Sequence, residues 1–178
     1  MTAPVIYTIG HSTRSAEQFV ALLQAHHVDC LADIRTVPRS RHNPQFNEDA
    51  LASTLATRAI RYVRIAGLGG FRRTSADSPN AGWRNLSFRG YADYMQTQAF
   101  AENLDALIAL ARDHTVAIMC AEAVPWRCHR SLVADALLVR GVRALEIASE
   151  TKTTAHRLTP FARVEGTRIR YPAAAPAG

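Results

Sequence analysis

Short apolar runs alternate with amphipathic segments along most of this chain, and this alternation limits the fold more than any other feature. Five runs are rich in apolar and β-branched residues, as buried strands are: Val5–Ile9, Cys30–Arg35, Tyr62–Ile65, residues 115–121 and Arg143–Ala148. Between and around them, apolar residues fall at helical spacing after Ser15 and within Glu48–Arg58, Phe88–Met95, Phe100–Arg112 and residues 128–139. The alternation predicts a mainly parallel sheet of about five strands with helices on both faces, a three-layer α/β sandwich.

Boundary signals agree with this division of the chain. Ser15 and Gln18 have the spacing of a capping box at a helix start, and Gly141 is placed to end the helix before it. Residues 71–87 carry no sustained period and indicate a long surface loop, whereas Glu165-Gly166 indicates a hairpin turn. At 178 residues a single domain is expected, with a core over about 5–162 and a partly flexible tail over 163–178.

The expected location is the cytoplasm, and no membrane association is expected. No apolar run approaches the roughly 20 residues needed to cross a bilayer, and residues 1–9 lack the features of a secretory signal. Three cysteines cannot all pair with one another, so free thiols are expected at Cys30, Cys120 and Cys128.

The charge of the chain bears on its partners. Its formal net charge is +6, and Lys152 is the only lysine among 21 basic residues. Arginine binds carboxylate and phosphate through a planar fork that lysine lacks. The charge therefore favours an anionic small molecule or a nucleic acid as partner, or else forms only a solvated basic surface.

Polar residues follow each of the first four predicted strands. The carboxyl ends of parallel strands lie along one edge of a sheet, where ligands of open α/β folds bind. This edge would collect Gly10-His11-Ser12, Asp33 with Arg35, Gly67–Gly70, and Cys120 with Glu122. Their convergence predicts a site more strongly than any one residue does.

Each group also has a purely structural interpretation. His11 is either a general acid or base, a phosphate contact, or a locally packed loop residue. Asp33 and Arg35 form either a ligand clamp or an internal ion pair. Gly67–Gly70 either lets a phosphate approach the backbone or makes a tight turn, and it matches neither a dinucleotide fingerprint nor a P-loop. No cofactor is expected.

The segment Cys120–Arg130 contains the most reactive groups. Glu122, just beyond a buried strand, is the first candidate for acid, base or nucleophile, unless it only pairs with Arg127 or Arg130. Cys128 at a helix start is expected to have a lowered pKa, and Cys120 is expected to pack in the core.

Metal binding is the weaker interpretation of the same segment. Cys120, Cys128 and His129, with Glu122 or His11, offer enough ligands for a tetrahedral site. Their spacing matches no zinc pattern, so no metal is expected.

These separated motifs together resemble those of the domain-of-unknown-function family 488. The resemblance runs in matching order over residues 6–150 and reappears in the tail. It is carried by Thr8–Ser12, Asp33–Arg35 with Pro38 and Ser40, Leu68–Gly70, Phe88–Tyr91 with Tyr94-Met95, Cys120–Glu122, Pro125, Cys128–Arg130, His156 and Leu158–Pro160. The family has no established activity, so the resemblance implies a set of site residues rather than a reaction.

The resulting hypothesis is a small enzyme, a hydrolase or transferase, acting on an anionic nucleotide-like or nucleic-acid substrate. The expected catalytic residues are Glu122, Asp33, His11 and Cys128. The expected substrate-binding residues are Ser12, Arg35, Ser40, Gly69, Gly70, Tyr91, Arg127, His129 and Arg130. Two alternatives stay open: a non-catalytic nucleic-acid or nucleotide binder, and a thiol-dependent or metal-binding site at Cys128.

Overall fold

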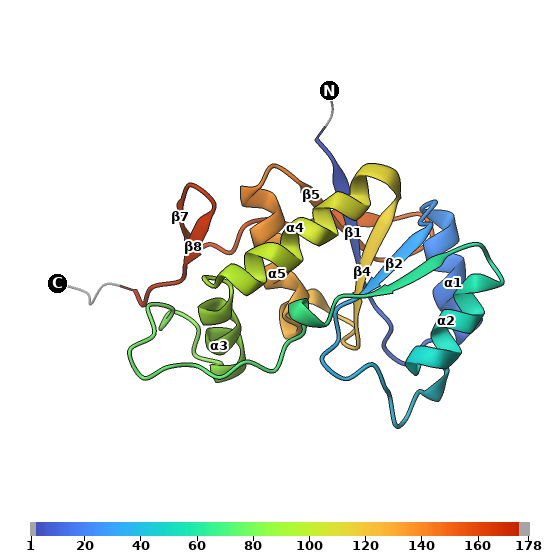
Figure 1. The fold of residues 1–178 in the computed structure, drawn as a ribbon, viewed down its shortest axis with the longest axis horizontal. Coiled ribbons are helices and arrows are strands. Elements are labelled where there is room, and N and C mark those ends of the chain that lie inside the picture. Colours follow the sequence, from blue (N-terminus) through green and yellow to red (C-terminus); the bar gives the residue numbers. More distant parts are fainter. Residues whose placement is uncertain (1–2, 175–178) are drawn as a thin grey trace.

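A six-stranded sheet lies between two layers of helices in the computed structural model, which describes residues 3–174 (Figure 1). Its strand order is β3-β2-β4-β1-β5-β6. The strands are β1 (Val5–Gly10), β2 (Cys30–Asp33), β3 (Arg61–Arg64), β4 (Val116–Cys120), β5 (Arg143–Ile147) and β6 (Thr153–Ala155). The first five are parallel, and β6 pairs antiparallel with β5. The predicted sandwich is confirmed; the sequence pattern missed β6, because its three residues carry no apolar run.

The helices cover the two faces of the sheet unequally. α1 (Ala16–Ala25) and α2 (Glu48–Ala56) cover one face, and α3 (Leu86–Tyr94), α4 (Gln98–Asp113) and α5 (Arg130–Val139) cover the other. The chain moves one way along the sheet from β1 to β3 and the opposite way from β3 to β5. Right-handed crossovers then place the two groups of helices on opposite faces.

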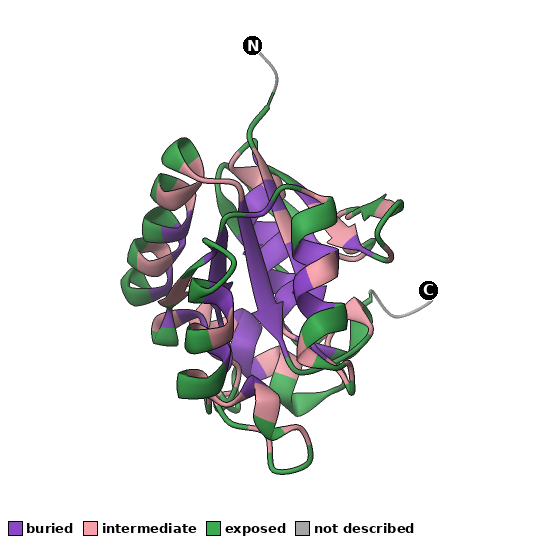
Figure 2. Ribbon diagram, turned by 90° about the vertical axis from the view of Figure 1, so that its right-hand side faces the viewer, coloured by how far each residue is buried: buried purple, intermediate pink, exposed green. Residues whose placement is uncertain are grey.

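Side chains of neighbouring residues on a strand point to opposite faces and divide the core in two. Ile6 and Ile118 pack with α3, α4 and α5, whereas Ile9 and Met119 pack with α1 and α2. All five residues of β4 are buried, as expected for a central strand covered on both sides (Figure 2).

Most predicted boundaries hold to within two residues. The capping box of Ser15 and Gln18 is present at the start of α1. α3 begins at Leu86, before the predicted Phe88, because the Asn85 side chain accepts hydrogen bonds from the backbone of the first turn. β2 ends at Asp33 rather than Arg35, because the Asp33 carboxylate accepts a hydrogen bond from the Arg35 backbone.

The expected hairpin at Glu165-Gly166 is also present. β7 (Arg163–Glu165) pairs antiparallel with β8 (Arg168–Arg170), and Gly166 turns between them with a φ of 64°.

The C-terminal segment is held against α5 by one buried carboxylate. Asp135 is fully buried and accepts hydrogen bonds from the backbone and hydroxyl of Thr159 and from the hydroxyl of Tyr171; His156 Nε2 lies 2.7 Å from its Oδ1. Tyr171 is itself fully buried. Ordered structure thus continues past residue 162, where the core was expected to end, and the last part of the tail expected to be flexible, 175–178, lies outside the described residues.

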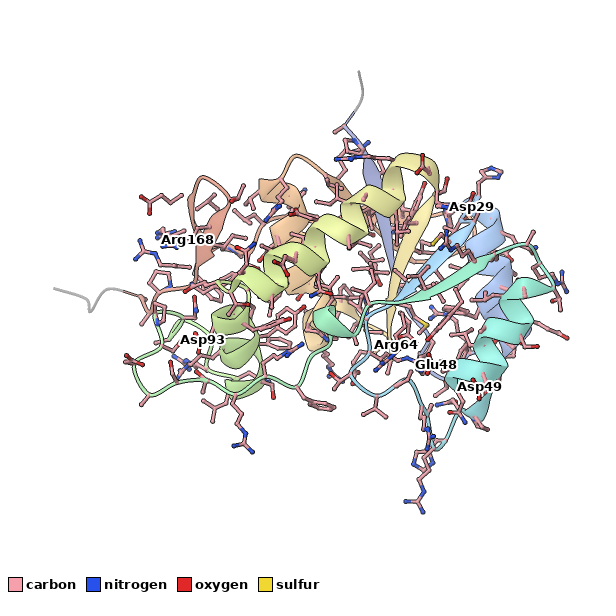
Figure 3. All side chains as sticks on the ribbon, viewed as in Figure 1. Asp29, Glu48, Asp49, Arg64, Asp93 and Arg168 are labelled. Atoms are coloured by element: carbon pink, nitrogen blue, oxygen red, sulfur yellow. The ribbon has the colours of Figure 1, made fainter. Side chains whose placement is uncertain are left out.

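Asp93 of α3 fixes the long segment that precedes this helix (Figure 3). The segment begins after η2, a short 3-10 helix (Ala66–Leu68). The Asp93 carboxylate accepts hydrogen bonds from the hydroxyls of Thr74 and Ser78, the backbone of Ser75 and the amide of Asn80. Burial opposes ionisation, but these donors lower the pKa of Asp93. No helix within residues 3–174 has the length and hydropathy to cross a membrane.

Candidate functional site

A cleft of about 450 Å³ lies at the carboxyl edge of the sheet, between the segments that follow β2 and β4. These strands are neighbours, but the chain leaves β2 toward α2 and leaves β4 toward α5, on the opposite face. A crevice opens where such connections diverge. Its lining includes Arg35, Arg39, Phe71, Glu122, Arg127 and Cys128.

Asp33 and Arg35 form an internal ion pair. Arg35 donates from Nη2 to Asp33 Oδ2 at 2.7 Å and from Nε to Oδ1 at 2.9 Å. The hydroxyl of Tyr62, on β3, donates to the same Oδ2 at 2.6 Å, and burial together with this bond raises the pKa of Tyr62. Asp33 is 0% exposed and its oxygens are occupied, so it orients Arg35 rather than facing a ligand.

Arg35 nevertheless has one amino group without a partner. The residue is only 4% exposed and forms part of the cleft wall, yet its Nη1 finds no hydrogen-bond partner among residues 3–174. Buried donors are almost always paired in folded proteins, so this nitrogen is available to a water molecule or to a bound group.

His11 carries a second unpaired atom near the first. Its Nδ1 lies 2.8 Å from the carbonyl oxygen of Ser12, which assigns the proton to Nδ1, and its Nε2 has no partner in the described chain. The ring stacks on Phe46 with centroids 4.3 Å apart. Burial lowers the pKa of His11, so a neutral ring with a free Nε2 lone pair is favoured. His11 is 2% exposed and is not among the residues that line the cleft.

Other expected binding residues mainly support the backbone. Ser12 has a φ of 50° and donates its backbone N–H to Ala121, and the Ser40 hydroxyl accepts a hydrogen bond from Asn43 within its own loop. The Tyr91 hydroxyl donates to the carbonyl of Leu68.

The hydrogen bond from Tyr91 to Leu68 and two neighbouring hydrogen bonds hold the segment Gly67–Gly70 in place. The Tyr94 hydroxyl and the Arg72 guanidinium donate to carbonyls of Gly67 and Gly69. Of the expected glycine contacts, Gly70 lines the cleft, and the carbonyl of Gly69 is occupied by Arg72.

Glu122 lies on the cleft and is exposed to solvent. Its carboxylate forms no ion pair with Arg127 or Arg130 in the described chain. The backbone carbonyl of Glu122 instead accepts from Arg130 Nη1 at 2.8 Å. The backbone is thus fixed while the side chain stays free to face a ligand.

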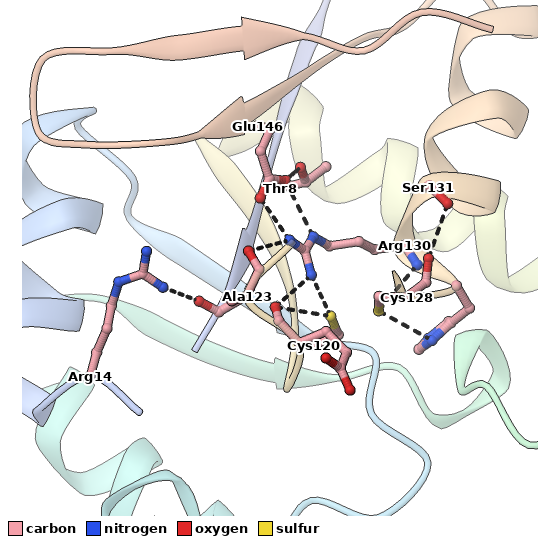
Figure 4. Close-up of polar contacts among 11 residues, drawn as sticks. Thr8, Arg14, Cys120, Ala123, Cys128, Arg130, Ser131 and Glu146 are labelled. Carbon is pink, nitrogen blue, oxygen red and sulfur yellow. Dashed lines mark hydrogen bonds and ion pairs between the residues drawn. The ribbon is translucent and has the colours of Figure 1, made fainter. Parts of the chain in front are cut away.

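Arg130 is the centre of a dense cluster of polar contacts (Figure 4). It is 0% exposed and donates to both oxygens of Glu146, to the carbonyls of Glu122 and Ala123, and to the sulfur of Cys120. These bonds occupy Nε, Nη1 and Nη2. The expected contact between Arg130 and substrate is therefore not favoured by this geometry, in which Arg130 shapes the 121–129 segment.

Of the two thiols near Arg130, Cys120 is buried in the core as expected, but Cys128 does not have the expected lowered pKa. Burial and a hydrogen bond to Cys120 raise the pKa of Cys128, which corrects the expectation that a helix start would lower it. Burial opposes ionisation of Cys120 too, but the Cys128 hydrogen bond and the Arg130 guanidinium outweigh it and lower the pKa of Cys120. The sequence pattern missed this, because no spacing shows that Arg130 turns back onto the end of β4.

His129 packs between the cleft and the core. Its Nε2 lies 3.0 Å from the carbonyl oxygen of Ile34, and its Nδ1 lies 3.6 Å from the sulfur of Cys128. Burial lowers the pKa of His129 to about 4. The ring is therefore neutral near pH 7, with Nε2 as donor and Nδ1 as acceptor.

The expected alternative of a metal site does not form. Residues 3–174 contain no group of three or more His, Cys, Asp or Glu side chains that could hold a metal ion. The Nε2 of His129, which would be a ligand atom, is used by the backbone of Ile34.

Two features of the cleft were not predicted. Phe71 lies on the cleft with 81% of its surface exposed, and Arg39 is exposed on the segment after β2. The sequence analysis left Arg39 and Phe71 out of the site, because both occur in loops without periodicity. The sequence pattern that could have indicated both residues is an aromatic residue in a loop rich in arginine. The same pattern also occurs on solvated loops.

One of three comparisons with known proteins found a match. A family model described as "Domain of unknown function DUF488" matches residues 15–137. No curated protein and no solved structure matches the chain significantly. The matched region includes Asp33, Arg35 and the whole Cys120–Arg130 segment, and it covers more than half of the chain. The chain therefore belongs to the DUF488 family.

Proposed function

We propose that this protein is a cytoplasmic enzyme, a hydrolase or transferase, that binds an anionic nucleotide-like substrate in the cleft between β2 and β4. The observation that carries the proposal is the buried Arg35 guanidinium with an unpaired Nη1 in the cleft wall. A phosphate or carboxylate oxygen is the natural partner of such a group. Three unpaired cysteines support the cytoplasmic location.

The other cleft residues support an anion with an aromatic part. Arg39 and Arg127 add positive charge to the walls, and exposed Phe71 offers a flat face to a base. Stacking of a base on an aromatic ring contributes about 1–3 kcal/mol to binding, and guanidiniums on both sides suit phosphate groups. A nucleotide satisfies both features better than a small inorganic anion does.

Glu122 is the proposed acid, base or nucleophile. It reaches the cleft from the segment after β4, and no ion pair in the described chain neutralises it. Positioned carboxylates transfer protons to and from leaving groups or water in hydrolysis and group transfer. Asp33 acts as a positioning residue for Arg35 through the hydrogen bonds that it accepts from the guanidinium.

Binding is tested first with adenosine and guanosine mono-, di- and triphosphates and a short single-stranded RNA, by calorimetry and thermal shift. Arg39→Ala and Arg127→Ala should each weaken binding about tenfold, as the loss of one exposed phosphate contact would. Arg168→Ala removes the same charge from the β7–β8 hairpin and should leave binding unchanged (Figure 3). Absence of binding to every probe would overturn the proposal.

Catalysis is tested by following consumption of the bound probes by mass spectrometry. Glu122→Gln should abolish consumption while preserving the melting temperature and the affinity, because the exposed side chain has no structural contact to lose. Binding without consumption in the wild type would instead identify a non-catalytic nucleotide binder. A binder of nucleic-acid backbone would show affinity for the RNA that falls steeply with salt.

A further inference from the structure

The arrangement of Cys120, Cys128 and Arg130 points to a second activity of this protein. We propose that Cys120 and Cys128 form a redox-active dithiol, in which Cys120 reacts with a hydroperoxide and Cys128 then closes an intramolecular disulfide. The reaction uses neither Glu122 nor a nucleotide. Cys120 and Cys128 are both buried, but both residues contribute to the lining of the cleft, from which a molecule as small as hydrogen peroxide can approach them.

The Arg130 guanidinium contacts the Cys120 sulfur directly. Arg130 Nη1 donates a hydrogen bond to Cys120 Sγ at 2.7 Å. The same Arg130 is fully buried and already paired with Glu146, so the cation is fixed beside the sulfur. A fixed positive charge stabilises a thiolate, which is the form that attacks peroxides.

Cys128 contacts the same arginine as Cys120. The backbone N–H of Arg130 donates to the Cys128 sulfur at 3.4 Å, and the side chain of Arg130 donates to the Cys120 sulfur. Cys128 lies at the turn before α5, and Cys120 at the last position of β4 (Figure 4). A reactive thiol beside a second one that stays protonated is the arrangement of a peroxide-sensing pair.

The chemistry balances with hydrogen peroxide as the oxidant. The Cys120 thiolate attacks one oxygen, the O–O bond breaks, and the departing hydroxide takes a proton to form water. Cys120 becomes a sulfenic acid. The Cys128 sulfur then attacks the Cys120 sulfur, the S–O bond breaks, and hydroxide leaves as a second water with the proton from Cys128. His129 Nδ1, 3.6 Å from Cys128 Sγ, is placed to relay that proton.

Oxidation would alter the cleft through Arg130. A disulfide sulfur is a weaker acceptor than a thiolate, so Arg130 Nη1 would keep only the carbonyl of Glu122 as a strong partner. The segment that carries Glu122 would then lose one of the contacts that fix it.

The third cysteine provides an internal control. Cys30 lies on β2, is 0% exposed, and has its pKa raised by burial. It should therefore react with peroxide on the order of a hundredfold more slowly than Cys120.

The experiment treats the purified full-length protein with one equivalent of hydrogen peroxide, then denatures it in an alkylating agent and digests it with trypsin. Cleavage after Arg127 separates the two cysteines, so a disulfide joins two different peptides. We expect this linked pair in the wild type with Cys30 fully alkylated. Cys128→Ser should instead accumulate a sulfenic acid at Cys120 that dimedone traps, and Cys120→Ser should do neither.

The outcomes separate the proposal from its rivals. A linked pair together with a trapped sulfenic acid at Cys120 in Cys128→Ser supports it. Oxidation of Cys30 at the same rate, disulfides only between molecules, or no oxidation of folded Cys120 would each overturn it. Circular dichroism of the two serine variants shows whether they are folded before they are compared.

Discussion

Single residues in this protein take roles that their neighbours decide. Arg130 and Arg35 have the same side chain, and both are almost fully buried beside a carboxylate. Arg130 uses all three nitrogens of its guanidinium within the protein, whereas Arg35 leaves Nη1 unpaired. The first therefore shapes the segment after β4, and the second is the proposed anion contact.

His129 should make stability depend on pH. Burial lowers the pKa of His129 from 6.5 to about 4, so between these values the unfolded chain binds more protons than the folded protein. Stability is then complete above pH 6.5 and is lost as the pH falls toward 4, by at most about 3 kcal/mol from this residue. His11, whose pKa burial also lowers, acts in the same direction.

Urea unfolding at a series of pH values measures this dependence. His129→Gln keeps an N–H donor for Ile34 but removes the titrating ring. The stability of this variant should therefore fall less than that of the wild type as the pH is lowered from 6.5 to 4. Equal slopes for both proteins would contradict the assignment. A titration of the His129 ring by NMR gives a direct value for comparison.

At the scale of elements, close packing limits which residues the helices on the α3–α5 face can contain. Gly90 lies in the middle of α3, where a glycine normally weakens a helix. A Cβ built on Gly90 would meet the carbonyl oxygen of Arg72 at 2.1 Å. The glycine is present because the 71–73 segment crosses the helix directly above it.

Gly90→Ala should therefore destabilise the protein despite the gain in helix propensity. The propensity term favours alanine by about 1 kcal/mol, but overpacking against backbone costs about 1–3 kcal/mol and displaces the cleft wall at Phe71. Ser87→Ala, on the exposed side of the same helix, should change stability by less than about 0.5 kcal/mol. A rise in the unfolding free energy of Gly90→Ala would contradict this prediction, because it would show that the 71–73 segment moves aside at little cost.

At the scale of the whole molecule, hydrogen bonds of a few polar side chains join segments that are distant in the chain. Asp135 joins α5 to the C-terminal segment, Asp93 fixes the long segment before α3, and Asn80 in that segment accepts from the backbone of Tyr171. We propose that the chain folds as one domain that includes Tyr171, because these bonds connect the C-terminal segment to the same core.

Asp135→Asn should loosen the C-terminal segment. An amide cannot accept all the hydrogen bonds that the buried carboxylate accepts, so we expect a loss of about 3 kcal/mol. Hydrogen exchange over residues 156–171 should accelerate more than in β4. The control is Asp105→Asn, which removes an exposed ion pair with Arg140 and should cost less than about 1 kcal/mol. Similar effects of both variants would contradict the proposed anchoring role.

The sequence by itself determined the layers, the parallel strands, the main helix boundaries and the family. These follow from local patterns, since a buried strand or a helix face leaves its period in neighbouring residues. The polar residues at the strand ends were also visible, because the end of an apolar run marks the edge of the sheet.

Only the tertiary structure decided what each of those polar residues does. No spacing reveals that Arg130 pairs with Glu146 and Cys120, that Tyr62 occupies Asp33, or that Arg35 keeps an unpaired nitrogen. Such roles depend on which distant groups share a desolvated space, and there burial and one neighbouring charge decide the pKa and the free hydrogen bonds of a side chain.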